Sequence, residues 1–121
     1  MLKVFLIEDA ARIRSALIEI LQATGKIEVV GFAEGQREAL RQLRSIEWDV
    51  AIVDIGLREG NGLAILEALH NDQRSYGVCF VFSNYPSLAL KERSLALGAA
   101  AFFDKSREIG ELIDRVQTMA C

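Results

Sequence analysis

Five short, mostly hydrophobic runs divide the chain. They cover residues 3–7, 27–33, 50–53, 78–82 and 99–104, and a polar residue follows each of them. Short runs with little alternation between polar and hydrophobic positions are typical of strands that are buried on both faces of a parallel sheet. The sequence therefore predicts five buried, parallel strands.

The segments that follow the strands carry the spacing of amphipathic helices. In the first, Leu17 and Leu21 lie four positions apart, and Gly25 is expected to stop the helix at its C′ position. The second helix is expected over residues 38–46 and the fifth over residues 107–119. Four residues are expected to face inward from the fifth helix: Ile109, Leu112, Ile113 and Val116.

Polar and special residues mark the limits of the remaining two helices. Asn61 suits the N-cap of the third helix, and Pro86 suits the first turn of the fourth, which Gly98 is expected to end. Alternating strands and helices joined by right-handed crossovers predict a doubly wound, five-stranded parallel α/β sheet with five helices. The chain has no internal repeat, linker or low-complexity segment, so residues 1–121 are expected to form a single domain.

The composition narrows the class of protein further. Of the 121 residues, 51% are hydrophobic, which is enough for a core of domain size. The net charge of −3, with lysine and arginine scattered along the chain, argues against direct binding to nucleic acid. The sequence shows neither a membrane span nor a signal peptide, so we expect a cytoplasmic protein without membrane contact.

Reactive side chains lie immediately after four of the predicted strands. Glu8 and Asp9 follow the first run, Asp54 follows the third, Ser83 the fourth and Lys105 the fifth. The carboxyl ends of parallel strands meet at one edge of an open α/β sheet, and ligands bind in the crevice there. We therefore expect these five side chains to line one crevice.

The three carboxylates of Glu8, Asp9 and Asp54 would repel one another unless a proton or a cation lay between them. Mg²⁺ fits this set because it prefers oxygen ligands and retains several waters. A carboxylate beside Mg²⁺ can attack a phosphoryl group and carry it as an acyl phosphate. In such a transfer the ion, Lys105 and the Ser83 hydroxyl would each neutralise one phosphoryl oxygen. The residues thus predict a Mg²⁺-dependent phosphoacceptor site at Asp54.

This set of residues resembles the receiver domain of two-component response regulators, the CheY-like superfamily. The likeness extends over the whole chain. Leu57 and Gly62 lie three and eight positions after Asp54, as in the family, and residues 97–99 read Leu-Gly-Ala ahead of the last strand. The resemblance implies the strand order 2-1-3-4-5.

The resemblance also implies roles within the site. Asp54 would accept a phosphoryl group from the histidine of a kinase or of a histidine phosphotransfer protein. Asp9 and Asp54 would bind Mg²⁺ directly, together with the backbone carbonyl of Gly56, and Glu8 would act mostly through water.

Three positions depart from the family pattern. Arg58 and Ser106 stand where proline is usual, and a cis bond before Ser106 would cost about 2.5–4 kcal/mol, so we expect a trans bond. Asn84 replaces a much smaller residue and is expected to gate access to the acceptor. The switch is expected to retain its two parts: Ser83 moves toward the phosphoryl oxygens, and Phe102 swings into the space that it leaves.

The fourth helix carries four leucines in two columns. Leu88 and Leu95 share one side, Leu90 and Leu97 share another, and the two sides differ by about 200° around the helix axis. One face of a sheet cannot bury both columns. Some of these leucines are therefore expected to be exposed, where an effector or a second copy of the chain would contact this helix and the last strand.

We expect a stand-alone phosphoacceptor that signals by conformational change and catalyses only its own phosphorylation and dephosphorylation. A small phosphohydrolase with the same acyl-phosphate chemistry is an alternative, but such enzymes usually carry an acid two positions after the nucleophile, where this chain has Gly56. A receiver that no longer uses phosphate and serves as a scaffold is a second alternative, and the complete set of five residues argues against it. A flavin-binding carrier could share the fold, but residues 8–12 lack the phosphate loop that it needs.

Overall fold

The computed structural model describes residues 1–74, 76–84 and 87–121 and contains one five-stranded parallel sheet. The strands are β1 (Leu2–Ile7), β2 (Ile27–Ala33), β3 (Val50–Val53), β4 (Val78–Ser83) and β5 (Ala101–Asp104), in the order β2-β1-β3-β4-β5. The predicted strands and the implied order are confirmed. The hydrophobic runs are continuous because the inner strands are covered on both faces.

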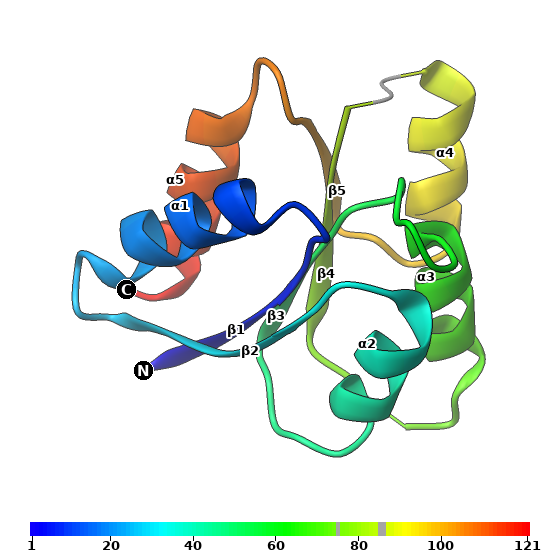
Figure 1. Ribbon diagram of the computed structural model, residues 1–121, viewed down its shortest axis with the longest axis horizontal. Helices are drawn as coiled ribbons and strands as arrows, with labels where there is room; N and C mark the ends of the chain where they lie inside the picture. Colours follow the sequence, from blue (N-terminus) through cyan, green and yellow to red (C-terminus); the bar gives the residue numbers. More distant parts are fainter. Residues whose placement is uncertain (75, 85–86) are drawn as a thin grey trace.

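Five helices cover the two faces of the sheet (Figure 1). They are α1 (Ala11–Gln22), α2 (Gln36–Leu43), α3 (Gly62–Asn71), α4 (Leu88–Ala96) and α5 (Ile109–Met119). Helices α1 and α5 lie on one side, and α2, α3 and α4 lie on the other (Figure 1). Within the described residues, no helix combines the length and the apolar character that crossing a bilayer requires.

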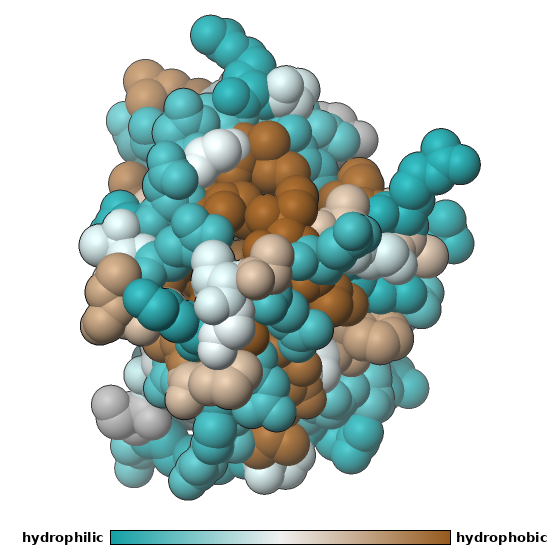
Figure 2. All heavy atoms as spheres, turned by 90° about the vertical axis from the view of Figure 1, so that its left-hand side faces the viewer, coloured by the Kyte–Doolittle hydropathy of each residue, from teal (hydrophilic) through white to brown (hydrophobic). Residues whose placement is uncertain are grey.

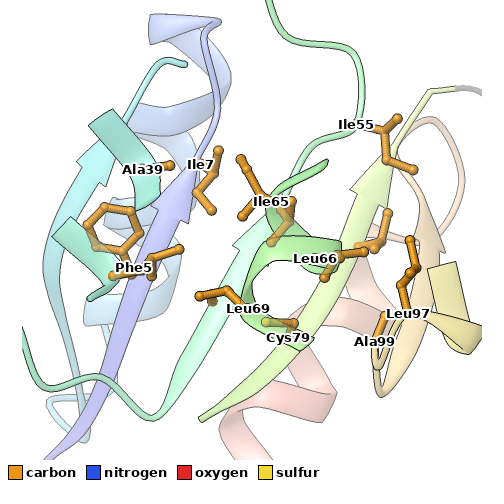
Figure 3. Close-up of a cluster of buried hydrophobic side chains, with 14 of the residues drawn as sticks. Phe5, Ile7, Ala39, Ile55, Ile65, Leu66, Leu69, Cys79, Leu97 and Ala99 are labelled. Carbon is orange, nitrogen blue, oxygen red and sulfur yellow. The ribbon is translucent and has the colours of Figure 1, made fainter. Parts of the chain in front are cut away.

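The sheet separates two hydrophobic cores. Successive side chains of a strand point to opposite faces, so Phe5 and Ile7 belong to the core under α2 and α3, whereas Val4 and Leu6 belong to the core under α1 and α5. Figure 3 shows the first of these cores, in which Ile65 and two leucines of α3 point toward the strands. Both cores hold the strands rigidly, and the strand ends are therefore fixed points for side chains that follow them.

Two of the predicted helix ends are confirmed and one is wrong. The Asn61 side chain accepts a hydrogen bond from Ala64 N at 2.8 Å, as an N-cap should. Gly98 directly follows the C-cap of α4 with a φ of +99°, which is the predicted C′ role. Gly25, in contrast, lies two residues beyond the C-cap Ala23, because α1 ends earlier than its hydrophobic spacing suggests. Pro86, expected in the first turn of α4, lies outside the described residues.

Other helix limits and one inward position also differ from expectation. The second helix spans Gln36–Leu43 instead of 38–46, because its first turn packs on the loop that follows β3. Ile109 was expected to face inward from the fifth helix, but it is the first helical residue and is 40% exposed. The three other inward residues of α5 are buried, as predicted.

The leucines of α4 separate as the two-column argument predicts. Leu88 is 72% exposed and Leu95 is 41% exposed. Leu90 packs partly against the core, and Leu97, at the C-cap, is buried within it. The expected contact surface therefore consists of Leu88 and Leu95, and Leu97 is removed from it.

Candidate functional site

The candidate residues lie where β1, β3, β4 and β5 end. Ile7 of β1 pairs with Val53 of β3, and the amide of Asp54 donates to the Ile7 carbonyl at 3.0 Å. Adjacent parallel strands thus end in step, which brings the residues after them to one edge of the sheet. Lys105 is held at the same edge, because its amide donates to the Ser83 carbonyl at 2.9 Å.

Three carboxylates form a cluster at this edge. One oxygen each of Glu8, Asp9 and Asp54 lies within 4.8 Å of the other two. Glu8 and Asp54 are only 3% and 5% exposed, whereas Asp9 is half-buried. The cluster is therefore open to solvent on the side of Asp9.

Lys105 lies between two of the carboxylates. Its Nζ is 2.6 Å from Glu8 Oε1 and 2.7 Å from Asp54 Oδ2, and the side chains of all three residues are almost completely buried. Burial opposes the charged form of the lysine, but the hydrogen bonds to Asp54 and Glu8 outweigh it, so the pKa of Lys105 is raised. The ammonium group thus stays charged over the physiological range.

Among the three acids, Glu8 has a carboxyl group whose pKa is shifted upward. Burial raises the pKa of its carboxyl group, and the nearby charge of Asp54 acts in the same direction. The hydrogen bonds from Lys105 and from the Ala10 amide, at 3.1 Å, reduce this effect without cancelling it. Burial therefore disfavours the charged form of Glu8 even with Lys105 beside it. A further cation at this place would favour the charged form.

The loop after β3 surrounds Asp54 with backbone groups. The Gly56 amide donates to Asp54 Oδ1 at 3.3 Å, and the Arg58 amide donates to Asp9 Oδ2 at 2.8 Å. A Cβ atom at Gly62 would collide with the backbone carbonyl of Asp54. This close approach gives a physical reason for glycine eight positions after the candidate acceptor.

The predicted switch residues lie on β4 and β5, the two strands beyond Asp54 in the sheet order. Ser83 is fully buried, and its hydroxyl finds no hydrogen-bond partner among the described residues. Phe102 is also buried and belongs to the core under α3. Asn84, the expected gate, is exposed directly after Ser83. A buried hydroxyl without a partner costs free energy unless a ligand satisfies it, so Ser83 is positioned to respond to one.

The turn that carries Lys105 is held by side chains. Asp104 Oδ1 accepts hydrogen bonds from the Ser106 amide at 3.0 Å and from the Ser106 hydroxyl at 2.8 Å. These bonds lower the pKa of Asp104. Glu108 in turn accepts from the Asp104 amide at 2.9 Å. No cis peptide bond occurs in the described residues, so the bond before Ser106 is trans, as expected.

Sequence reasoning missed Arg14 of α1. Its Nη1 donates to the Glu8 carbonyl at 2.8 Å, and its guanidinium lies 4.1 Å from the centre of the Phe32 ring. Arg14 therefore fixes the backbone that presents the first two carboxylates. The only signal in the sequence is an arginine near the start of a helix that directly follows the acidic pair. The role of Asp104 was also missed. Its hydrogen-bond partners lie in a turn, and hydrophobic periodicity carries no information about turns.

The donor set suits the Mg²⁺ ion that the family resemblance implies. All three side chains offer oxygen, which is the ligand that Mg²⁺ prefers, and the partly open side of the cluster leaves room for bound waters. Burial, with a smaller contribution from the charge of Asp54, raises the pKa of Glu8, so a cation bound here would favour the ionised carboxylate.

Comparison with known proteins identifies the family. The model of the response regulator receiver domain matches residues 4–117. The chain therefore belongs to the family of response regulator receiver domains, which serve two-component signalling systems. Receiver domains generally bind Mg²⁺ at an acidic pocket, and here Glu8, Asp9 and Asp54 lie close together.

Curated relatives are longer than this chain. It is 29% identical over 117 residues to the DNA-binding transcriptional activator DevR/DosR of Mycobacterium tuberculosis, covering 97% of this chain and 54% of that protein. It is 33% identical over 120 residues to the transcriptional regulatory protein UhpA of Salmonella typhimurium, covering 99% of this chain and 59% of that protein. The chain thus spans little more than half the length of these two relatives.

Solved structures share the fold. The CheY-like receiver domain protein of Methanospirillum hungatei superimposes with a TM-score of 0.86 at 24% identity, covering 99% of this chain and 94% of that one. A LuxR-family DNA-binding response regulator from Staphylococcus aureus gives a TM-score of 0.88 at 17% identity over the full length of both chains. At such identities the likeness shows the fold alone.

Proposed function

We propose that this receiver domain accepts a phosphoryl group on Asp54 from a partner histidine, in a Mg²⁺-dependent reaction, and signals by a change of conformation. Residues 1–121 act as one domain in this proposal. The observation that carries it is the position of Asp54. This buried carboxylate lies 2.7 Å from the Lys105 ammonium, within a cluster of acids. At the same edge of the sheet, the buried hydroxyl of Ser83 has no hydrogen-bond partner among the described residues.

The chemistry follows from these neighbours. An oxygen of Asp54 attacks phosphorus and forms the new O–P bond, while the bond from phosphorus to the donor nitrogen breaks and the imidazole leaves with its electron pair. Lys105 neutralises charge on one phosphoryl oxygen. Ser83 would donate its hydroxyl hydrogen to another, which would satisfy a buried group that has no partner within residues 1–74, 76–84 and 87–121.

Asp9, Asp54 and the backbone carbonyl of Gly56 would hold Mg²⁺ directly, and Glu8 would act through water. When bound, the ion supplies positive charge to the phosphoryl oxygens during transfer. Its positive charge would also favour the ionised form of Glu8, whose pKa is raised mainly by burial.

The phosphodonor would come from another protein. His70 is the one histidine of the chain and lies near the end of α3. Gly62, at the other end of this helix, closely approaches Asp54. Eight residues of helix add about 12 Å, so His70 is too far away to donate to Asp54. A kinase or a histidine phosphotransfer protein would therefore supply the group.

The face formed by α1 and α5 suits such a donor. Figure 2 shows this face, with hydrophobic atoms gathered near its centre. Ile13 of α1 is partly buried there, and Ile109 of α5 is 40% exposed. Both residues lie in the first turn of their helices, and α1 begins two residues after Asp9 whereas α5 begins four residues after Lys105. A helix bearing a phosphohistidine could therefore contact them and reach Asp54.

Signalling would use the other side of the site. Movement of Ser83 toward the phosphoryl group frees space that Phe102 can enter. Phe102 lines a groove of about 550 Å³ together with Leu88 and Lys91 of α4 and Arg107 and Glu108 near α5. Its movement would reshape this groove next to the exposed Leu88, where an effector or a second copy of the chain would bind.

The decisive experiment is mass spectrometry after incubation with acetyl phosphate, with and without Mg²⁺. We expect one labile phosphoryl group per chain, dependent on Mg²⁺ and absent from Asp54→Asn. Asp49→Asn is a matched control, because Asp49 lies before β3 at the opposite edge of the sheet. Labelling of Asp54→Asn, or no labelling of the unsubstituted chain by acetyl phosphate or by a kinase, would contradict the proposal.

Further measurements separate this proposal from its alternatives. Continuous turnover of free phosphate esters would favour a phosphohydrolase, whereas a single incorporation favours a receiver that acts only on itself. Faster labelling of Asn84→Ala would support Asn84 as a gate. With beryllofluoride and Mg²⁺, hydrogen exchange should change in residues 83–105. No change there, and an unaltered sedimentation coefficient, would exclude output through α4.

A further inference from the structure

The carboxylate of Asp9 is bonded differently from the other two acids of the cluster. Glu8 and Asp54 both use their two oxygens, each accepting from Lys105 on one oxygen and from a backbone amide on the other. Asp9 Oδ2 accepts from the Arg58 amide at 2.8 Å, whereas Asp9 Oδ1 accepts no hydrogen bond from the described residues. One oxygen of Asp9 is therefore held, and the other is free for a ligand.

We infer that the main-chain amide of Arg58 is a positioning donor, which orients Asp9 so that its free oxygen binds Mg²⁺. The inference rests on the proposed function, because it assumes that the ion binds at this cluster. Carboxylates that bind metals are commonly oriented by such an outer hydrogen bond. The bond to a charged acceptor is also stronger than one between neutral groups.

The Arg58 amide can donate to Asp9 only because this position is not proline. Proline has no N–H group, so it could not donate to Asp9 from this position. The family pattern usually has proline here, and this chain has Arg58. The backbone of the residue supplies the interaction, while its side chain is exposed.

The loop that carries Arg58 is held by the first turn of α2. The Gln36 amide donates to the Glu59 carbonyl at 3.0 Å, and the Arg37 amide donates to Glu59 Oε1 at 3.1 Å. In the reverse direction, Gln36 Oε1 accepts from the Asn61 amide at 3.1 Å. Three hydrogen bonds thus fix the residues immediately after Arg58.

Steric contact at Gly60 adds to these hydrogen bonds. Gly60 has a φ of +74°, and a Cβ atom there would collide with the Gln36 side chain. The loop and the start of the helix therefore touch closely at Glu59 and at the two residues that follow it. As a result, the Arg58 amide has little freedom to move away from Asp9.

Two substitutions of one residue separate its amide from its side chain. Arg58→Ala retains the N–H group, and Arg58→Pro removes it; both remove the same positive charge. Mg²⁺ affinity is measured by calorimetry without any phosphodonor. We expect Arg58→Pro to bind Mg²⁺ about tenfold more weakly than Arg58→Ala. Arg58→Ala should bind at least as tightly as the unsubstituted chain, because it removes an exposed positive charge near the ion.

The outcomes that would overturn the inference are distinct from those that affect the proposed function. Equal affinities in folded Arg58→Pro and Arg58→Ala would overturn the role of the amide and leave the proposed function intact. If the unsubstituted chain did not bind Mg²⁺, the proposed function would fail and this inference would fail with it. Melting curves and amide spectra show whether each variant is folded.

A second variant tests the same idea without introducing proline. Gln36→Ala removes the acceptor of the Asn61 amide and should loosen the loop. We expect faster hydrogen exchange at the Arg58 amide together with weaker Mg²⁺ binding. Arg37→Ala is the control, because it retains the backbone bond to Glu59 and should change neither. Faster exchange at Arg58 with unchanged Mg²⁺ affinity would overturn the inference even if Arg58→Pro did not fold.

Discussion

The two edges of the sheet both carry charged side chains, but they differ in how well these charges are paired. At the carboxyl edge, one ammonium group, that of Lys105, is shared between two buried carboxylates. Burial raises the pKa of Glu8, and the Ser83 hydroxyl has no partner among the described residues. At this edge, therefore, the negative charge of the carboxylates is only partly compensated, and a buried hydroxyl has no partner among the described residues.

At the amino edge, a charged network is nearly complete. Arg44 donates to both oxygens of Asp72, at 3.0 and 3.2 Å, and the Tyr76 hydroxyl donates to Asp72 at 2.6 Å. Tyr76 in turn stacks on Trp48 with 5.9 Å between the ring centres. The hydrogen bonds from Arg44 and Tyr76 lower the pKa of Asp72.

The difference shows which edge is suited to chemistry. The paired charges of Arg44 and Asp72 are partly exposed to water. They would gain little from binding a ligand. Buried carboxylates that share a single ammonium group are stabilised when a further cation arrives, and perturbed pKa values mark such places. The following predictions test this contrast, from the largest expected effect to the smallest.

The largest effect is expected from alanine at two glycines, one at each edge. A Cβ atom at Gly62 would collide with the Asp54 carbonyl, and one at Gly77 would collide with the Asp49 carbonyl. Each substitution should lower the free energy of unfolding by about 1–3 kcal/mol, measured in urea. Only Gly62→Ala should also slow labelling by acetyl phosphate, because of the two glycines only Gly62 closely approaches Asp54, the proposed acceptor. Equal slowing by Gly77→Ala would contradict the contrast.

Gly110 provides the control for those two variants. A Cβ atom there meets nothing within 4 Å, and the residue lies inside α5. Gly110→Ala should therefore stabilise the protein by about 0.5–1 kcal/mol, because alanine is the better helix former.

Removal of the shared cation should have the next largest effect. Lys105→Met leaves Glu8 and Asp54 without their common partner, and we expect a loss of about 2 kcal/mol at pH 7 without Mg²⁺. This lies below the usual cost of breaking a buried pair, because the cluster is partly open to water. Lys91→Met, at an exposed position of α4, should change the stability by less than about 0.5 kcal/mol. A similar loss in both variants would mean that Lys105 does not compensate the cluster.

The corresponding change at the amino edge should be small. Arg44 and Asp72 are partly exposed, with side chains 44% and 25% accessible. Arg44→Ala should therefore lower the free energy of unfolding in urea far less than Lys105→Met does, and it should leave phosphoryl labelling unchanged. A loss as large as that of Lys105→Met would show that the amino edge is not the better compensated one.

Acid should act on the two edges in opposite directions. The raised pKa of Glu8 means that its contribution to stability is complete below its ordinary value of 4.5 and is lost as the pH rises through the raised pKa. The lowered pKa of Asp72 means that its contribution is present above 3.8 and is lost as the pH falls through the lowered pKa. Urea unfolding without metal ions tests both assignments. Glu8→Gln should remove the loss of stability at rising pH, and Asp72→Asn should remove the loss at falling pH. A slope above pH 4.5 that persists in Glu8→Gln would refute the assignment to Glu8.

Much of the fold could be predicted from the sequence because burial on both faces leaves a local mark. The limits of β2 and β3 agree with their hydrophobic runs to the residue. Helix limits agreed less well, since a helix end depends on what the next turn packs against. Gly98 was placed correctly and Gly25 was not, although both have positive φ, because only Gly98 directly follows a C-cap.

The sequence by itself therefore determined which residues form the strands and which reactive side chains follow them. Only the tertiary structure decided how those side chains are paired. Lys105 reaches Asp54 across 51 positions, and the Arg58 amide reaches Asp9 across 49. Hydrophobic periodicity reports the surroundings of a residue within its own helix or strand, whereas these bonds depend on how separate loops pack together at the edge of the sheet.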